Sequence, residues 1–250
     1  MRSGLQANSP EKSDNMNSLS SALANLSRLG FDLAELWRRG SPDTFALPVG
    51  GYGKRTLDIG FASILILAFF PLFLMLALLV KFSDGGPVFF SHIRVGRNRC
   101  AFRCLKFRTM AVNSAELLRC HLEDNPEARE EWALTQKLKN DPRITAVGRV
   151  LRKSSLDELP QLINILRGEM SVVGPRPVIR NEIRKYGQHA EFYLRARPGL
   201  TGPWQVSGRN DVSYETRVAF DRNYVENWSL VTDLVIILRT VPAVLLGRGY

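Results

Sequence analysis

Hydrophobic residues along the chain gather in one long run and several short ones. Every residue from Ile59 to Val80 is uncharged. As a helix this run would measure about 33 Å, enough to cross a hydrocarbon core of about 30 Å. It lies too far along the chain for a secretory signal peptide, and no small-residue cleavage site follows it. The pattern therefore predicts a membrane segment.

Two features leave the path of this segment through the membrane open. Pro71 lies near the middle, where it removes one backbone hydrogen bond and kinks the helix. Lys54 and Arg55 precede the run and Lys81 follows it, so the positive-inside rule gives no direction. A kinked span satisfies these features, and so does a helix-break-helix that enters and leaves by the same leaflet.

Residues 1–50 precede the segment and are rich in Ser, Asn, Gly and Pro at their edges. This composition predicts a mostly disordered arm. Apolar residues at helical spacing within it suit an amphipathic helix on the bilayer surface, a partner-binding arm or a transient helix without a role. These residues are Leu19, Leu23, Leu26, Leu33 and Trp37.

The elements after the membrane segment are short. Residues 88–110 predict two strands joined by a turn at Gly96-Arg97-Asn98. Residues 111–139 predict a charged outer helix, which Asn140-Asp141-Pro142 ends. Apolar residues at helical spacing from Leu159 to Leu166 predict a further helix, and the glycine that follows is a natural stop.

The last third of the chain continues this alternation. A brief strand is expected over Ser171–Val173, a helix over Glu182–Arg195 and a loop from Arg197 to Asn210. The final apolar run, from Leu230 to Leu246, contains two charged residues and a proline, which argues against a second span and for an interfacial or packed helix. The interrupting residues are Asp233, Arg239 and Pro242.

Short strands among helices predict an α+β fold in three parts. The parts are the mostly disordered arm over 1–50, a membrane helix-break-helix over 51–82 and a compact domain over 83–250. A chain of 250 residues can bury a substantial core.

The chain is basic, with 34 Lys and Arg against 24 Asp and Glu and a formal net charge of +10. This excess suits nucleic acid, anionic lipid head groups or phosphorylated substrates. The aromatic residues do not interleave with basic ones as they do on single-strand-binding surfaces. Together with the membrane segment, the charge favours lipids and nucleotides over nucleic acid.

Three cysteines, Cys100, Cys104 and Cys120, are too few and odd in number for a disulfide framework, and they indicate a reducing compartment. With His121 they could supply zinc ligands, but their spacing matches no common structural-zinc pattern. The simpler interpretation is a half-buried strand whose one face carries Cys100, Phe102 and Cys104.

The most informative chemical motif is the pair of adjacent carboxylates Asp157 and Glu158. Pro160 is tolerated without loss only in the first turn of a helix, so a helix is expected to start near Asp157. Free N–H groups at a helix start favour anions, which would draw a phosphate or the carboxylates themselves to this point. An ordinary helix cap with an acidic first turn is the alternative.

Basic residues near the carboxylates favour phosphate chemistry. Pro175 and Pro177 restrict the backbone of Arg176, whose fork suits a phosphate. Arg152 and Lys153 lie just upstream and could neutralise a diphosphate. A Mg²⁺ ion held by a carboxylate would complete the site, and an aspartate can attack a phosphoryl group to give an acyl-phosphate intermediate. A rigid turn and a solvated charge run are the alternatives.

Five motifs stand in a fixed order: Lys54-Arg55-x-x-Asp58, Lys106-Phe107-Arg108-Thr109-Met110, Arg152-Lys153-x-Ser155-Leu156-Asp157-Glu158-Leu159-Pro160-Gln161, Val173-Gly174-Pro175-Arg176-Pro177 and Arg197-Pro198-Gly199-Leu200-Thr201-Gly202. From Lys54 onward the chain resembles the bacterial sugar transferases, the monotopic phosphoglycosyl transferases that begin polysaccharide assembly on a polyprenyl phosphate. Within this family it is most similar to the succinoglycan-type galactose-1-phosphate transferases of exopolysaccharide synthesis.

The resemblance implies that a UDP-sugar and undecaprenyl phosphate give undecaprenyl-diphospho-sugar and UMP, with Mg²⁺ required. Galactose is the favoured sugar and glucose the next. By this resemblance Asp157 is the nucleophile that takes the sugar phosphate, Glu158 binds Mg²⁺ with Asp157 as a second ligand, and Arg176 contacts phosphate. Further substrate or phosphate contacts are expected from Arg108, Arg152, Lys153 and Gln161, and uridine contacts from the region between Arg197 and Arg209.

The resemblance also implies a re-entrant broken helix and a domain on the cytoplasmic face of the bacterial inner membrane, with amphipathic interfacial helices. Downstream glycosyltransferases and further copies of the chain are compatible partners. Family members usually carry Ser-Pro at the break, whereas this chain has Phe70-Pro71. The contribution of the serine is therefore missing, although the proline kink remains.

Two other functions stay open on the sequence alone. A non-enzymatic, membrane-anchored module would bind anionic lipid or nucleic acid through its basic domain. A transferase that moves the sugar without its phosphate would release UDP instead of UMP. The chain contains no Asp-x-Asp nucleotide-sugar motif, which argues against the second of these.

Overall fold

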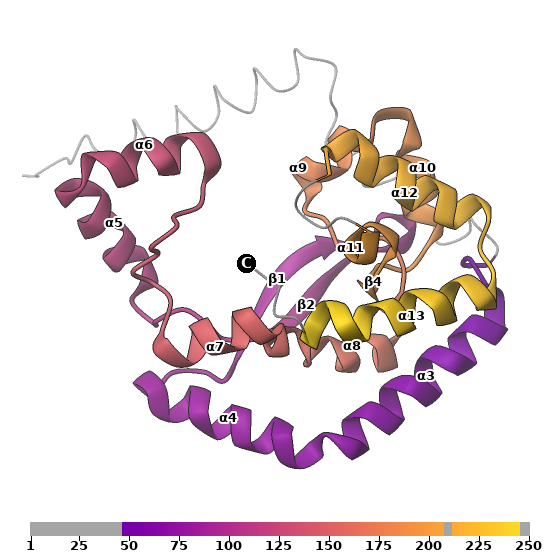
Figure 1. Cartoon of the computed structure of the whole chain (residues 1–250), viewed down its shortest axis with the longest axis horizontal. Coiled ribbons are helices and arrows are strands. Elements are labelled where there is room, and N and C mark those ends of the chain that lie inside the picture. Colours follow the sequence, from indigo (N-terminus) through magenta and orange to yellow (C-terminus); the bar gives the residue numbers. More distant parts are fainter. Residues whose placement is uncertain (1–46, 208–211, 246–250) are drawn as a thin grey trace, which may run out of the picture. The chain divides into compact units, whose positions relative to one another are not determined.

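The computed structural model describes residues 47–207 and 212–245. The predicted helix of the N-terminal arm lies outside the described residues, as do residues 208–211 of the predicted loop. Figure 1 shows a pair of long helices along the lower edge, with the strands and the remaining helices above it.

The long apolar run forms two helices, α3 (Gly51–Ala68) and α4 (Phe70–Asp84). They are bent by 67° at Phe69, and Pro71 lies in the first turn of α4, where its missing N–H costs least. The predicted proline kink is confirmed. Among the described residues neither helix alone is long and apolar enough to cross a membrane. The bent pair together meets the length and composition of a span, and no other property of a span is shown. The re-entrant path stays a prediction.

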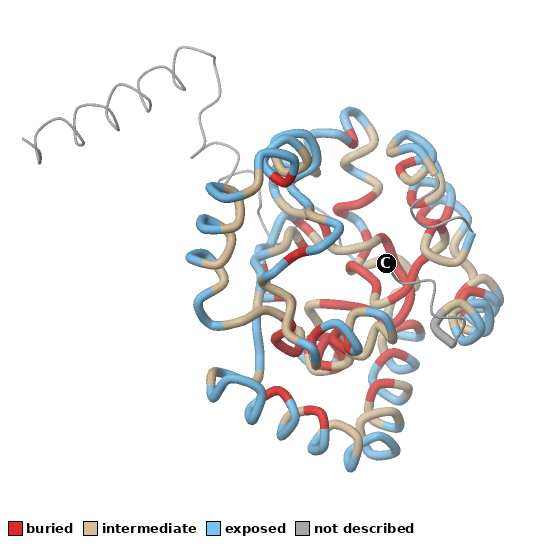
Figure 2. Tube along the Cα trace, turned by 60° about the vertical axis from the view of Figure 1, so that its left-hand side comes forward, coloured by how far each residue is buried: buried red, intermediate tan, exposed pale blue. Residues whose placement is uncertain are grey.

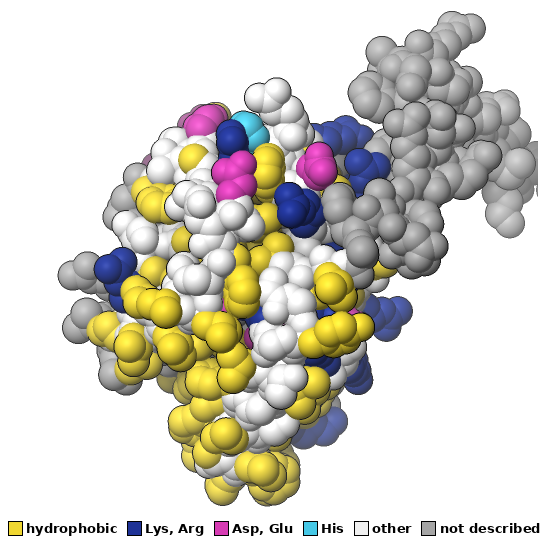
Figure 3. Space-filling model, turned by 90° about the vertical axis from the view of Figure 1, so that its right-hand side faces the viewer, with side chains coloured by type: hydrophobic (Ala, Val, Ile, Leu, Met, Phe, Trp, Pro, Cys, Tyr) yellow, Lys and Arg dark blue, Asp and Glu magenta, His cyan; other side chains and the backbone are white. Residues whose placement is uncertain are grey.

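One side of this helix pair is packed and the other is exposed. Ala62, Leu76 and Val80 are buried against the rest of the domain. Large apolar side chains on the opposite side are exposed, and Figure 3 shows hydrophobic side chains gathered over the lower part of the molecule. The exposed residues include Ile64, Leu67, Phe70, Leu74, Leu78 and Phe82. Such a continuous apolar surface is typical of contact with lipid or another protein.

The predicted strand pair is confirmed. Strands β1 (Phe89–Val95) and β2 (Ala101–Phe107) are antiparallel, with Phe89 opposite Phe107, and the turn between them lies at Arg97–Arg99. Phe102 and Cys104 point into the core, but Cys100 is exposed and lies before the strand. Within the described part of the chain no cluster of three metal-ligating side chains forms, so the zinc alternative has no support.

The charged region after β2 forms two helices instead of one. Helices α5 (Ser114–Asp124) and α6 (Pro126–Thr135) are separated at Asn125. The Asn125 side chain accepts a hydrogen bond from the Ala128 N–H and so caps α6. The next helix is α7 (Ala146–Ser154), which Thr145 caps in the same way.

The central segment combines short helices with a second small sheet. It consists of the 3₁₀ turn η2 (Leu156–Glu158), helix α8 (Gln161–Arg167) and strand β3 (Ser171–Val173). Strand β3 pairs in parallel with β4 (Gly199–Thr201). The strand over 171–173 and the stop at Gly168 were predicted correctly. Strand β4 lies in a region that was predicted to be a loop. The prediction missed it because a strand of three residues is too short to show an alternating pattern.

The helix predicted over Glu182–Arg195 is wrong as a continuous element. It is divided into α9 (Arg180–Ile183), the 3₁₀ helix η3 (Arg184–His189) and α10 (Ala190–Arg195). Gly187, with φ of 52° and ψ of −128°, breaks the helical path.

Three further helices complete the described chain: α11 (Pro203–Ser207), α12 (Tyr214–Glu226) and α13 (Leu230–Leu245). No element was predicted for residues 214–226. Helix α13 confirms the prediction of a packed helix, because Asp233 and Ile236 are buried. Its other face exposes Leu230, Val231, Leu234, Leu238 and Val241.

Figure 2 shows the buried segments concentrated in the interior of the domain. The main core joins Phe102 of β2, Leu162 and Ile165 of α8, Val173 of β3 and Ala62 of α3. Helix α3 therefore shares one core with the strands. The α+β class is confirmed, and the membrane-type helix pair is packed against the domain.

Candidate active site

Asp157 and Glu158 lie in the turn η2, between α7 and α8. Ser155 ends α7 in the left-handed conformation with φ of 57°, and Pro160 is the N-cap of α8, which begins at Gln161. The helix expected to start near Asp157 begins there as the 3₁₀ turn η2, whereas the α-helix itself begins only at Gln161, after the proline. The two carboxylates are placed by a separate turn between two helices.

Lys106, to which the sequence analysis gave no role, joins the two carboxylates. It extends from β2, and its Nζ donates to Glu158 Oε1 at 2.7 Å and to Asp157 Oδ2 at 3.3 Å. The exposed fraction of the side chain is 28% for Lys106, 11% for Asp157 and 20% for Glu158. The cluster is therefore largely covered but still reachable from solvent.

Burial and charge act differently on the three groups. Burial raises the pKa of Asp157 above its usual value, and the charge of Lys106 opposes this without cancelling it. Burial also opposes ionisation of Glu158, but the charges of Lys106 and Arg176 outweigh it and lower the pKa of that carboxyl. The two carboxylates likewise outweigh burial and raise the pKa of Lys106. Adjacent carboxylates with pKa values shifted apart are typical of groups with different roles.

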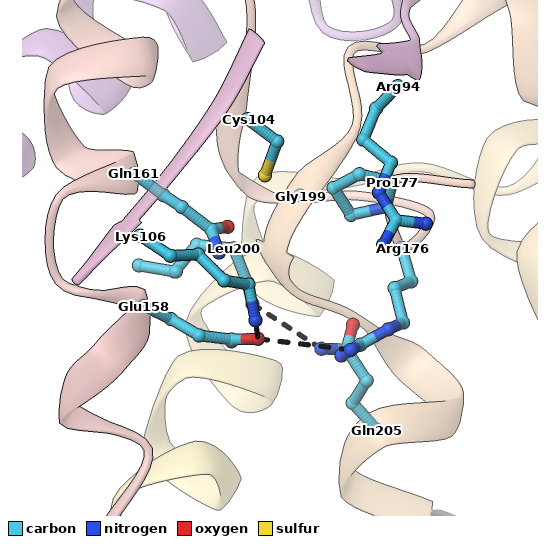
Figure 4. Close-up of a pocket in the computed structure, with 10 residues that line it drawn as sticks. All are labelled: Arg94, Cys104, Lys106, Glu158, Gln161, Arg176, Pro177, Gly199, Leu200 and Gln205. Atoms are coloured by element: carbon cyan, nitrogen blue, oxygen red, sulfur yellow. Dashed lines mark hydrogen bonds and ion pairs between the residues drawn. The ribbon is translucent and has the colours of Figure 1, made fainter. Parts of the chain in front are cut away.

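Arg176 approaches the same carboxylate from the opposite side of the pocket. Its Nη2 lies 3.8 Å from Glu158 Oε1. The turn that carries it follows β3, and at its start a Cβ on Gly174 would lie 2.4 Å from the carbonyl oxygen of Arg197. Only glycine allows this close approach of the two backbones. Arg176 is thus positioned by the β3–β4 pair, and Figure 4 shows its side chain facing Glu158 and Lys106 across the pocket.

A pocket with a volume of about 270 Å³, including space open to solvent, lies between these groups. Basic and amide side chains dominate its lining, together with Leu200 and Cys104 (Figure 4). Burial raises the pKa of the Cys104 thiol to about 11, so this cysteine is not a thiolate near neutral pH. The polar lining residues are Arg94, Lys106, Glu158, Gln161, Arg176 and Gln205.

Of the lining residues, Gln161 and Arg176 were expected to contact substrate, and Gly199, Leu200 and Gln205 belong to the region expected to bind uridine. Arg94 and Lys106 were missed. Arg94 lies on a strand whose pattern gives no sign of a site, whereas Lys106 begins one of the five family motifs, and that motif was the signal that could have identified it. Only the β1–β2 pairing, with Arg94 opposite Phe102, places both on the pocket.

The remaining predicted phosphate ligands lie outside this pocket. Arg152 donates from Nε to Thr109 Oγ1 at 2.9 Å, and Lys153 is exposed on α7. Arg108 is buried, forms an ion pair with Asp84 at the end of α4 and donates to the Val80 carbonyl oxygen at 3.4 Å. In this arrangement Arg108 links β2 to the membrane-type helix.

The donor set of the cluster fits magnesium. Asp157 and Glu158 direct oxygens to one point, which Lys106 Nζ holds. Mg²⁺ is commonly bound by one or two carboxylates together with substrate phosphates. Because no third acidic, histidine or cysteine ligand converges here among the described residues, substrate phosphate and water would have to supply the other ligands.

Comparisons with known proteins identify the family of the chain. The family model described as bacterial sugar transferase matches residues 50–247. The exopolysaccharide production protein ExoY of Rhizobium meliloti is 62% identical over 202 residues, which cover 81% of this chain and 89% of that protein.

Two relatives carry names that state a reaction. The undecaprenyl-phosphate galactose phosphotransferase of Salmonella typhimurium is 53% identical over 78% of this chain and 41% of its own length. The UDP-glucose:undecaprenyl-phosphate glucose-1-phosphate transferase of Caulobacter vibrioides is 42% identical over 77% of this chain and 69% of its own.

Proposed function

The chain belongs to the bacterial sugar transferase family, and on this basis we propose that it transfers a hexose-1-phosphate from a UDP-sugar to undecaprenyl phosphate and releases UMP. Enzymes of this family act in exopolysaccharide production and in sugar-phosphate transfer to a lipid, as the names of the relatives state. Membership of an enzyme family argues against the non-enzymatic binding module. Galactose is the favoured sugar, because three similar proteins carry names that state galactose, and glucose is the next, because one carries a name that states glucose.

The observation that carries the proposal is one ion-pair cluster of two carboxylates and two basic residues. Glu158, Lys106 and Arg176 line the pocket, and Asp157 joins them through its ion pair with Lys106. Phosphoryl transfer needs a positioned nucleophile and positive charge around the transferred group. Asp157 supplies the nucleophile, and the two basic residues face the place where the phosphates would lie. The pocket also sits in a domain whose core includes a membrane-type helix, which suits a lipid acceptor.

The reaction follows in two steps. An Asp157 carboxylate oxygen attacks the phosphorus that bears the sugar, the bond to the second phosphate breaks, and UMP leaves with the bonding electron pair. An oxygen of undecaprenyl phosphate then attacks the same phosphorus and expels the Asp157 carboxylate. Mg²⁺, when bound at Glu158 and Asp157, neutralises the phosphate charge. Arg176 and Lys106 stabilise the charge on the transferred group, and the amides of Gln161 and Gln205 orient the donor.

Membrane association is part of the proposal. Helices α3 and α4 expose a continuous apolar surface, and α13 exposes a second apolar face. We expect both surfaces to contact lipid, with the pocket on the cytoplasmic side and α3–α4 re-entrant. A cysteine or tag placed near residue 40 should not be labelled from the periplasm. Periplasmic labelling at this point would contradict the re-entrant path.

The test of the reaction is transfer from radiolabelled UDP-galactose and UDP-glucose in membranes, with the released nucleotide identified. We expect UMP and a labelled lipid, with UDP-galactose the faster donor. Release of UDP instead would show that the sugar moves without its phosphate. If neither donor is used, a panel of other UDP-sugars is tested. Transfer from one of them would show that the choice of sugar is wrong, and transfer from none would contradict the proposal as a whole.

A further inference from the structure

The position of Lys106 has a consequence beyond charge stabilisation. Its ammonium nitrogen lies 2.7 Å from a Glu158 oxygen and 3.3 Å from an Asp157 oxygen. Those are the two side chains that the proposed reaction needs as metal ligand and nucleophile. In the described structure the lysine therefore occupies the point between the carboxylates where a divalent cation would bind.

Lys106 and a metal ion cannot use this point together. Both are positive, and a metal ion binds carboxylate oxygens at about 2.0–2.1 Å, a distance that leaves no room for an ammonium group between the same oxygens. The lysine side chain has a flexible four-carbon stem and three donors that can be redirected. Arg176 is less suited to this exchange, because its Nη2 lies 3.8 Å from the Glu158 oxygen and does not touch Asp157 in the described contacts.

The same contact offsets the repulsion between the two carboxylates. Two adjacent carboxylates that are largely covered repel each other, and like charges in such a position oppose ionisation. A lysine bound to both carboxylates offsets their repulsion and holds one oxygen of each directed at its ammonium group. The site is thereby kept ready for a cation before any substrate arrives.

Resting on the proposed function, we propose that Lys106 is an exchangeable internal counter-cation. It holds Asp157 and Glu158 in the substrate-free enzyme. It leaves them when the metal ion binds, and it then donates to the donor diphosphate at the same pocket. Lys106 is a positioning residue in the first state and a phosphate ligand in the second. No bond is made or broken in the exchange, which is a change of ion-pair partner.

The test measures metal binding directly, without turnover. Mn²⁺ serves as the probe because its electron paramagnetic resonance signal distinguishes free from bound ion. The full chain in nanodiscs is titrated without nucleotide, as wild type, Lys106→Gln, Lys106→Arg and Lys153→Gln. Lys153 is the matched control, since it is an exposed lysine on α7 close in sequence to the carboxylates.

Removing a competing cation should tighten metal binding. We expect Lys106→Gln to bind Mn²⁺ at least about tenfold more tightly than wild type, and Lys106→Arg and Lys153→Gln to stay within about threefold of it. Unchanged or weaker Mn²⁺ binding by Lys106→Gln would overturn the proposal, because a lysine that only supports the fold does not compete with the metal.

Two further measurements cover a loss of folding and the second state of the lysine. If Lys106→Gln lowers the unfolding temperature without metal, saturating Mn²⁺ should restore it, since the ion takes over the role of the lysine; failure to restore it contradicts the exchange. With saturating Mg²⁺, UDP should bind Lys106→Gln at least about fivefold more weakly than wild type. Equal UDP affinity would contradict the transfer of Lys106 to phosphate.

These readouts are independent of the proposed reaction. Wild-type chain that releases no UMP from any UDP-sugar, while Lys106→Gln still binds Mn²⁺ more tightly, would contradict the reaction and support the exchange. If the wild-type chain releases UMP and Lys106→Gln leaves the Mn²⁺ affinity unchanged, the reaction is supported and the exchange is contradicted.

Discussion

In the part of the chain that the structure describes, a lysine forms an ion pair with carboxylate groups in two clusters, which differ in burial and in how many carboxylates the lysine serves. In the anchor cluster, Lys54 of α3 pairs with Asp233 of α13. The same carboxylate accepts from the Tyr224 hydroxyl at 2.7 Å and from Trp228 Nε1 at 3.1 Å. Both charged side chains are about nine-tenths buried. The anchor cluster ties the membrane-type helix to the C-terminal helices.

In the pocket cluster, Lys106 is shared between two carboxylates, and the side chains keep between 11% and 28% of their surface exposed. One lysine cannot satisfy four carboxylate oxygens, so acceptor positions are left over for a metal ion. The same residue types therefore stabilise the fold where both oxygens of the carboxylate are bonded within the protein, and provide chemistry where acceptor positions are left open beside a pocket. Predictions that separate the two clusters test this difference.

The largest effect is expected on turnover at the pocket cluster. Asp157→Asn removes the nucleophile and should lower UMP release by about a thousandfold or more, as does removal of a nucleophile elsewhere. UMP is measured after incubation of membranes with UDP-galactose and Mg²⁺. Because the amide is close in shape to the carboxylate, the unfolding temperature should not fall. Turnover within about tenfold of wild type would remove Asp157 as the nucleophile.

The anchor cluster should respond in stability. Asp233→Asn removes the ion-pair partner of the buried Lys54 ammonium, and breaking a buried pair in this way costs about 3 kcal/mol or more. Thermal unfolding of the chain in nanodiscs measures the loss, and Asp157→Asn is the comparison variant. If the two variants unfold at the same temperature, the contrast between the clusters does not hold.

Glu158→Gln should change metal dependence more than the maximal rate. Loss of one charged ligand is expected to raise the Mg²⁺ concentration for half-maximal UMP release by about tenfold, within the range seen when a group that supports a metal is removed. The Mg²⁺ titration is compared with that of Gln205→Glu, which changes the charge of the same pocket in the opposite direction. An unchanged half-saturating concentration would count against Glu158 as a ligand.

The smallest effect is a shift in pH dependence. Burial raises the pKa of Asp157, and the reaction needs its ionised form, so kcat/KM should fall as the pH decreases through that raised pKa. The pKa of Glu158 is lowered, so Glu158 stays ionised over the same range and adds no second limb. Lys106→Gln removes a charge that lowers the pKa of Asp157, and the acid limb should move to higher pH. If the acid limb of the kcat/KM profile does not move, it reports the titration of a group other than Asp157.

The sequence predicts those features of this fold that neighbouring residues determine better than those that depend on residues far apart in the chain. Local patterns were sufficient for the break at Pro71, the β1–β2 hairpin and the stop at Gly168. They failed where a single glycine leaves the helical conformation within a helical pattern, and where pairing with a distant segment creates a strand. Gly187 breaks a helix that its neighbours would continue, and β4 exists because β3 is its partner.

The site shows the same limit. The motif around Asp157 and the Pro-Arg-Pro turn could be found by residue type, because carboxylates and a clamped arginine have few other uses together. Lys106 and Arg94 could not, since only strand pairing brings them to the pocket. Lys54 and Arg55 were counted as charges flanking a membrane segment. In the structure Lys54 belongs to the anchor cluster, and Arg55 donates to the carbonyl oxygens of Ile165 and Leu166.

The covalent step can be tested without the lipid acceptor. Purified chain in nanodiscs free of undecaprenyl phosphate is mixed with radiolabelled UDP-galactose and Mg²⁺, quenched rapidly and digested for mass spectrometry. The account predicts one UMP released per active chain and a hexose-phosphate on the peptide that contains Asp157, with the label lost when undecaprenyl phosphate is added. No labelled peptide under conditions in which added lipid still becomes glycosylated would contradict it.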